Sequence, residues 1–217
     1  MTPDGTVLTS QNVPTQDYTG SWALKVLRST DAGATWEATL IDRSREPPPC
    51  PEFAGCDYQL PSPQTAIASD DAGRVYLLYT FNRKKWGPAR LYLRTSVDEG
   101  ATWSPRVDVA RKARVDHGFP MIAATGTGDV RIAWLDDRTG RWNAWYKSSM
   151  DGGDTWSATQ RLSNRPGGAP YKSPRGFRFP YGDYGQIAID SDGNTQATWG
   201  ESRSYIGPGG SWYARGL

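Results

Sequence analysis

One eight-residue pattern occurs three times in the chain and constrains the fold more than any other feature. It is Ser-x-Asp-x-Gly-x-Thr-Trp, and five of its eight positions are identical in all three copies. The aspartates of successive copies are 67 and 53 residues apart, so a structural unit repeats while its loops vary in length. We call these segments the octets; they are Ser29–Trp36, Ser96–Trp103 and Ser149–Trp156.

The chemistry of the octets predicts a tight turn between two strands. An aspartate can accept hydrogen bonds from nearby backbone N–H groups, as in an Asx-turn, and a glycine fits a position of positive φ. The tryptophan then brings a large apolar surface toward the core at the start of the next strand. We therefore expect a structural role for the shared positions, which include Ser29, Asp31, Gly33, Trp36, Ser96, Asp98, Gly100, Trp103, Ser149, Asp151, Gly153 and Trp156.

A second pattern, consisting of a strand, a glycine-containing turn and another strand, predicts a hairpin ahead of each unit's third strand. It covers residues 65–79, 121–134 and 187–199, and residues 3–8 resemble the same turn without its first strand. With 24 Gly and 16 Pro, the composition also favours many short strands joined by turns. Third strands are expected at Ala23–Arg28, Ala89–Thr95, Ala144–Ser149 and Trp212–Arg215.

Each unit thus contains four antiparallel strands with an octet between the third and the fourth. Radial repetition of such units makes a β-propeller. The sequence therefore predicts a single all-β propeller domain of about four blades, in which the first blade lacks its first strand and the last lacks its fourth. The expected blades are approximately 1–46, 62–112, 118–164 and 183–217.

The octets and their blade context resemble the bacterial neuraminidase repeat, the Asp-box repeat of sialidases and their relatives. The resemblance covers nearly the whole chain and implies a six-bladed propeller, which needs more residues than the 217 present. We expect the chain to be the C-terminal portion of a longer propeller. The alternative is a smaller ring that closes by joining its two incomplete end blades.

Topology predicts which end of the propeller carries a binding site. The turns between strands 1 and 2 and the octets lie at one end, and the longer connections lie at the other, where binding residues are expected. At that end an arginine follows the second strand of three blades. Planar guanidinium groups suit the capture of a carboxylate, and sialidases use three arginines for sialic acid. The alternative is a structural salt bridge to Asp136, Asp137 or Glu201; the arginines are Arg83, Arg138 and Arg203.

Sialidase chemistry also requires a tyrosine nucleophile activated by a glutamate, and an aspartic acid as general acid, instead of the usual carboxylate pair. The resemblance suggests Glu201 beside Tyr205 for the first two roles, with Tyr181 and Tyr184 as alternative tyrosines. Asp136 or Asp183 would supply the acid.

Two further features add candidate binding residues. The segment Phe177–Pro180 echoes the Phe/Tyr-Arg-Ile-Pro motif of sialidases and adds Arg178, although the family has this motif in its first blade and not its last. Trp86 offers an aromatic face on which a sugar ring can stack, or it covers the end of a sheet.

Charge, cysteines and hydropathy limit the remaining possibilities. A net charge of +2 does not predict nucleic-acid binding, and Arg83–Lys85 is the only compact basic run. No apolar segment reaches the roughly 20 residues that span a bilayer, and the first five residues do not resemble a signal peptide. Cys50 and Cys56 suggest a small disulfide loop, or else two free thiols. No metal or cofactor motif occurs, so neither is predicted.

The functional hypothesis is a sialidase-like glycan-processing protein, secreted or extracytoplasmic, that acts on a carboxylate-bearing sugar such as sialic acid. Its partner would be a glycan or glycoconjugate, and missing blades or self-association would complete the ring. The alternative is a non-catalytic propeller that binds glycans or proteins, because a fold does not fix a function. A third possibility is a fragment whose missing blades held the chemistry.

Overall fold

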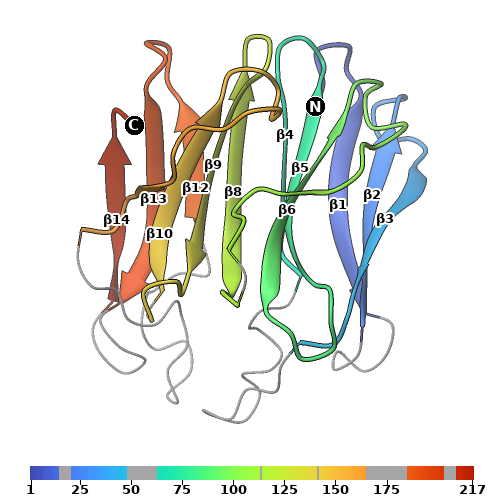
Figure 1. The fold of residues 1–217 in the computed structure, drawn as a ribbon. Coiled ribbons are helices and arrows are strands. Elements are labelled where there is room, and N and C mark those ends of the chain that lie inside the picture. Colours follow the sequence, from blue (N-terminus) through green and yellow to red (C-terminus); the bar gives the residue numbers. More distant parts are fainter. Residues whose placement is uncertain (15–20, 48–62, 113, 141, 165–184, 203–208) are drawn as a thin grey trace.

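The computed structural model describes residues 1–14, 21–47, 63–112, 114–140, 142–164, 185–202 and 209–217. These residues contain no helix and form four antiparallel sheets, which we number as blades 1 to 4 along the chain. The predicted all-β propeller is confirmed. In Figure 1 the sheets stand side by side from the blue N-terminal strands to the red C-terminal strands and do not close into a ring.

Blades 2 and 3 each have four strands in sequence order, and blades 1 and 4 each have three among the described residues. The fourth strands of blades 2 and 3 are only two residues long. Blade 1 contains β1 (Val7–Pro14), β2 (Trp22–Ser29) and β3 (Glu37–Ser44). Blade 2 contains β4 (Thr65–Ser69), β5 (Val75–Asn82), β6 (Ala89–Ser96) and β7 (Val107–Asp108). Blade 3 contains β8 (His117–Thr125), β9 (Asp129–Asp136), β10 (Asn143–Ser149) and β11 (Gln160–Arg161). Blade 4 contains β12 (Gly185–Ile189), β13 (Thr195–Ser202) and β14 (Gly209–Arg215).

The core of the molecule lies between successive blades. Central strand β5 is buried along its whole length because it has a neighbouring blade on each side. Apolar side chains of the described residues form three clusters, one at each blade-to-blade interface. Examples are Leu24 with Tyr79 between blades 1 and 2, Tyr76 with Ile132 between blades 2 and 3, and Tyr146 with Trp199 between blades 3 and 4.

The two ends of the blades differ in the way that the sequence predicts. We call the end with the octets and the turns between first and second strands the octet rim. We call the other end the loop rim; it lies at the bottom of Figure 1, where β5 connects to β6 and β9 to β10. The β8–β9 pairing shifts register between Gly118 and Met121, so a β-bulge lies in the first strand of blade 3 close to the loop rim.

Candidate functional site at the loop rim

The three octets adopt the same hydrogen-bonded turn at the octet rim. In the first, the Ser29 hydroxyl donates to Asp31 (2.7 Å) and accepts from the Gly33 N–H (2.8 Å). Asp31 also accepts from the backbone N–H of Thr35 at 2.8 Å, and the glycine has a φ of +92°. The other two octets repeat these bonds within about 0.1 Å.

Hydrogen bonds dominate the charge state of the octet aspartates. The threonine hydroxyl at the seventh position of each octet is the largest influence, and it lowers the pKa of Asp31, Asp98 and Asp151 to about 2. These carboxylates are therefore anionic, and each accepts hydrogen bonds within its own octet.

The octet tryptophans do not enter the core as fully as the sequence suggested. Each indole N–H donates to the carbonyl of its own octet glycine at 3.0–3.1 Å, so the ring folds back over the turn. Trp103 and Trp156 are partly buried against the interblade clusters. Trp36 is 43% exposed.

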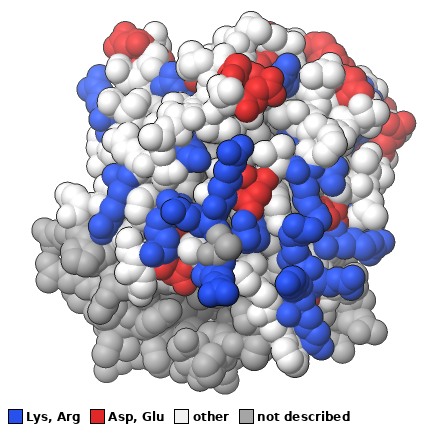
Figure 2. Space-filling model, viewed as in Figure 1, with Lys and Arg blue, Asp and Glu red and all other residues white. Residues whose placement is uncertain are grey.

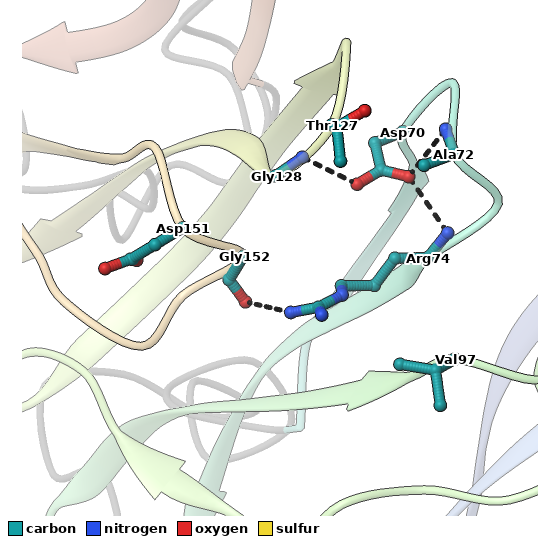
Figure 3. Close-up of a pocket in the computed structure, with 8 residues that line it drawn as sticks. All are labelled: Asp70, Ala72, Arg74, Val97, Thr127, Gly128, Asp151 and Gly152. Atoms are coloured by element: carbon teal, nitrogen blue, oxygen red, sulfur yellow. Dashed lines mark hydrogen bonds between the residues drawn. The ribbon is translucent and has the colours of Figure 1, made fainter.

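A pocket of about 340 Å³ opens at the octet rim between blades 2 and 3 (Figure 3). Its polar groups already bind one another. Asp70 accepts from the N–H groups of Ala72, Arg74 and Gly128 and from the Tyr76 hydroxyl, at 2.8–3.1 Å. The Arg74 guanidinium donates to the Gly152 carbonyl at 3.4 Å. We therefore interpret this pocket as part of a seam that joins two blades.

At the loop rim, Asp136 is fully buried and its oxygens are occupied. The Trp134 indole donates to Oδ2 at 2.7 Å, and Arg138 Nε lies 2.8 Å from Oδ1 and 3.0 Å from Oδ2. The guanidinium of Arg138 lies 4.1 Å from the centre of the Trp145 ring. Arg138 thus forms an ion pair with Asp136 of its own blade, one of the salt-bridge partners that the sequence suggested.

Glu201 occupies the corresponding position of blade 4 and is 6% exposed. Its carboxylate accepts from the Trp199 indole (2.9 Å) and from the Ser163 hydroxyl (2.6 Å). The Asn143 amide donates to its other oxygen at 3.3 Å. Because Ser163 and Asn143 belong to blade 3, Glu201 ties two blades together.

Arg83 and Trp86 lie in the connection between β5 and β6, and both are exposed. Arg83 makes no hydrogen bond or ion pair with another described residue, because Phe81 stands where blade 3 has Asp136. Trp86 is 59% exposed, and its indole N–H donates to Glu46 at 3.3 Å. Lys85 and, to a smaller extent, the Trp86 indole lower the pKa of the Glu46 carboxyl by hydrogen bonding to it.

The remaining predicted site residues lie outside the described part of the chain. They are Arg203, Tyr205, Arg178, Asp183, Tyr181, Tyr184, Cys50 and Cys56. Of the three arginines that the sequence suggested for carboxylate binding, the structure therefore describes Arg83 and Arg138. Arg138 extends from β9 over Trp145 of β10, and Arg83 is an exposed side chain that follows β5.

Asp116, which the sequence did not single out, is a carboxyl at the loop rim with strongly altered acidity. It is half-buried immediately before β8, and its Oδ1 accepts from the Ala89 N–H of blade 2 at 2.8 Å. Burial raises the pKa of Asp116 to about 6; Asp137 acts in the same direction, and the Ala89 N–H opposes both. Its Oδ2 has no hydrogen-bond partner among the described residues, so this oxygen can carry a proton.

The surroundings of Asp116 are also unusual. His117 is completely buried, its Nδ1 lies 2.9 Å from the Ala89 carbonyl, and burial lowers its pKa. Its Nε2 has no hydrogen-bond partner and lies 3.7 Å from Asp136. Phe119 follows in the β-bulge with a φ of +55°, a conformation that is costly for a bulky residue. Bulges of this kind are frequent beside active sites, where they redirect side chains.

The described residues contain no group of three His, Cys, Asp or Glu side chains that could hold a metal ion. Among them there is also no helix long and apolar enough to cross a membrane.

Comparisons with known proteins identify relatives of the fold. No protein-family model matches the chain, and no curated protein matches it. Among solved structures, an α-L-arabinanase of Penicillium chrysogenum in complex with arabinobiose is 16% identical with a TM-score of 0.58, and the match covers 95% of this chain and 59% of that one. A Hadza microbial sialidase is 17% identical with a TM-score of 0.56, over 99% of this chain and 43% of that one. A protein of unknown function from Dyadobacter fermentans is 20% identical with a TM-score of 0.57, over 98% and 58%.

The likeness shows the fold. This chain has the architecture that a sialidase and an arabinanase share, and it spans less than two thirds of the length of each. The bacterial neuraminidase repeat itself stays a resemblance carried by the octets. At such low identity, substrate and activity do not transfer from these proteins to this chain.

Proposed function

We propose that this chain processes glycans by hydrolysing glycosidic bonds at the loop rim, with Asp116 as proton donor. The observation that carries the proposal is the half-buried Asp116 carboxyl at the loop rim, whose Oδ2 has no hydrogen-bond partner among the described residues and whose pKa is raised to about 6 by burial. A general acid works best when its pKa lies near the working pH, because it then holds a proton that it readily gives up. Glycoside hydrolysis requires such a carboxylic acid at the leaving oxygen.

Asp116 replaces Asp136 as the proposed acid. Asp136 is fully buried and pairs with Arg138 and Trp134, so it has no oxygen available for a substrate. The Oδ2 of Asp116 has no hydrogen-bond partner among the described residues, and Asp116 lies next to a β-bulge. Glycoside hydrolysis also needs a second catalytic group, a carboxylate or a tyrosine. The candidates for it in this proposal are Tyr205 and Asp183, which lie outside the described residues.

The proposed substrate is a carboxylate-bearing sugar such as sialic acid. The support is the exposed guanidinium of Arg83 at the same rim, together with the fold that a sialidase shares. A neutral pentose is the comparison substrate, because a structural neighbour was solved with arabinobiose.

The test is the hydrolysis of fluorogenic sialosides and α-L-arabinofuranosides by the chain and two variants. Asp116→Asn removes the proton and keeps the shape of the side chain. Asp154→Asn is the matched control, because Asp154 is exposed in an octet at the opposite rim. We expect Asp116→Asn to lower kcat by about 10²- to 10⁴-fold and Asp154→Asn to leave it unchanged.

The outcomes separate the parts of the proposal. Full activity of Asp116→Asn would exclude Asp116 as the acid and leave the hydrolase in place. Cleavage of arabinofuranosides alone would exclude the carboxylate-bearing substrate. No cleavage of any substrate by a folded wild-type chain would reject hydrolysis.

The second candidate function is a non-catalytic propeller that binds glycans or proteins. The observation in its favour is that Asp136, Arg138 and Glu201 are all engaged in structural contacts within or between blades. A glycan array with the same two variants distinguishes this candidate. Binding that Asp116→Asn does not weaken, in the absence of hydrolysis, would support it.

We further propose an extracytoplasmic location, with a disulfide between Cys50 and Cys56. Mass spectrometry of the alkylated protein without reduction would test the bridge. Completion of the ring by further blades or by a second copy is a separate proposal, which the molar mass in solution tests.

A further inference from the structure

Trp86 combines an exposed indole with a strained backbone. The side chain is 59% exposed, and its φ is +59°. Bulky residues rarely adopt positive φ, and holding one there costs on the order of 1–3 kcal/mol. A glycine would occupy the position without this cost.

Blade 1 holds this tryptophan in place through Glu46, which follows β3. The backbone N–H of Trp86 donates to the Glu46 carbonyl at 2.9 Å, and the indole N–H donates to the Glu46 carboxylate at 3.3 Å. Lys85 lies 2.9 Å from the same carboxylate and 4.7 Å from the centre of the indole ring. The ring is therefore fixed in orientation, and Lys85 neutralises Glu46.

Two further cations near Trp86 in the sequence have no acidic partner among the residues that the structure describes. Arg83 and Lys84 are exposed, and neither forms an ion pair with any residue in the described ranges. In the view of Figure 2, Lys and Arg lie mainly over the middle and lower part of the surface, with some acidic side chains among them, and most acidic side chains lie at the top. Arg83, Lys84 and Lys85 outnumber Glu46 around the indole, so its described surroundings carry a positive potential, which attracts anions.

We propose that Trp86, Arg83 and Lys84 form a binding site for an acidic polysaccharide. The apolar face of a pyranose would stack on the fixed indole, and its carboxylate or sulfate groups would pair with the two free cations. A nucleic acid fits less well. Single strands need a series of aromatic stacking platforms and a basic groove, whereas the described part of this loop offers the single ring of Trp86 and the chain has a net charge of only +2. The site shares Arg83 with the substrate recognition proposed above, but binding there does not require hydrolysis by Asp116.

The experiment measures binding of the whole chain to immobilised polygalacturonate and heparin, with neutral dextran and duplex DNA as comparisons. We expect both acidic polysaccharides to bind and dextran not to bind. Trp86→Ala should weaken binding by about tenfold or more, as for an aromatic anchor in other interfaces. Arg83→Ala should weaken it by about threefold at low salt and have little effect at about 0.5 M salt.

Matched controls come from exposed residues far from the site. Tyr213→Ala removes an aromatic side chain that is 57% exposed, and Arg215→Ala removes the same charge as Arg83→Ala. Neither control should change binding by more than about twofold. Weakening of both by as much as Trp86→Ala would show that attraction is diffuse and would overturn the proposal.

Trp86→Gly separates a binding role from a structural one. The glycine relieves the strained φ, so the melting temperature should stay within about 2 °C of wild type while binding is lost. A drop of many degrees would assign Trp86 to stability and contradict the proposal. Equal binding of duplex DNA and polygalacturonate, unaffected by Trp86→Gly, would also contradict it, since charge alone would then explain the attraction.

Discussion

Blades 2 and 3 lie so close together at the octet rim that one added methyl group should destabilise their contact. Gly73 and Gly128 occupy equivalent turns and have the same φ of +85°. A Cβ on Gly73 would meet nothing within 4 Å, whereas a Cβ on Gly128 would lie 2.9 Å from the backbone nitrogen of Gly152. Alanine at the two positions therefore differs only in the contact between blades (Figure 3).

The expected costs follow from these contacts. Gly73→Ala carries only the strain of positive φ, about 1 kcal/mol. Gly128→Ala carries the same strain and also displaces the backbone of the facing octet. That shift strains the bond from the Gly152 N–H to the Gly128 carbonyl (2.9 Å) and the bond from the Gly128 N–H to Asp70 (3.0 Å). With about 1 kcal/mol for each bond, the total is about 3 kcal/mol.

Urea denaturation followed by circular dichroism compares the two variants with wild type. The free energy of unfolding should fall about 2 kcal/mol further for Gly128→Ala than for Gly73→Ala. For a chain of this length that difference corresponds to roughly 4–8 °C in melting temperature. Equal losses in the two variants would refute the close backbone contact between the blades.

Two further predictions concern charges. Arg106→Met should lower the free energy of unfolding, measured by urea denaturation, by about 2 kcal/mol, because Arg106 of blade 2 binds both oxygens of the largely buried Asp42 of blade 1 at 2.7–2.9 Å. Arg43→Met, at an exposed position, is the control. An equal loss of stability in the two variants would contradict the role of this ion pair. In the wild-type protein, a pKa of Asp116 raised to about 6 makes the folded state lose stability as pH rises from about 4 to about 6. Asp116→Asn removes this loss, so it should raise the free energy of unfolding by about 1–2 kcal/mol at pH 7 and leave it unchanged at pH 4. Unfolding measured at both pH values checks the sign, and stabilisation at pH 4 alone would contradict it.

The fold could be predicted from the sequence because its signals are local. Each octet forms its turn with hydrogen bonds between residues two to four positions apart, such as Ser29 to Asp31. The predicted third strands match β2, β6, β10 and β14 to within about one residue at most ends, and β14 starts three residues earlier than expected. Where the octet tryptophans lie was harder to predict, because the indole N–H can reach the glycine carbonyl three residues earlier.

The loop rim was less predictable because its chemistry depends on contacts between blades. Asp116 owes its altered acidity to burial beside Ala89, 27 residues earlier in the chain, and no local pattern marks this contact. Asp136 and Glu201 resembled site residues because each lies at the loop-rim end of a second strand. A tryptophan two residues before each acid donates its indole N–H to the carboxylate, and this spacing is the signal that pointed to a structural role.

Titration of the Asp116 carboxyl by carbon-13 NMR would establish whether this group holds a proton that it can donate, with Asp116→Asn to assign the signal. The proposal of a proton donor at the loop rim predicts an apparent pKa of about 6 for this group. It also predicts that the hydrolysis rate falls as pH rises through that value. An apparent pKa near the ordinary aspartate value of about 4 would contradict the account, because the carboxyl would then hold no proton to donate.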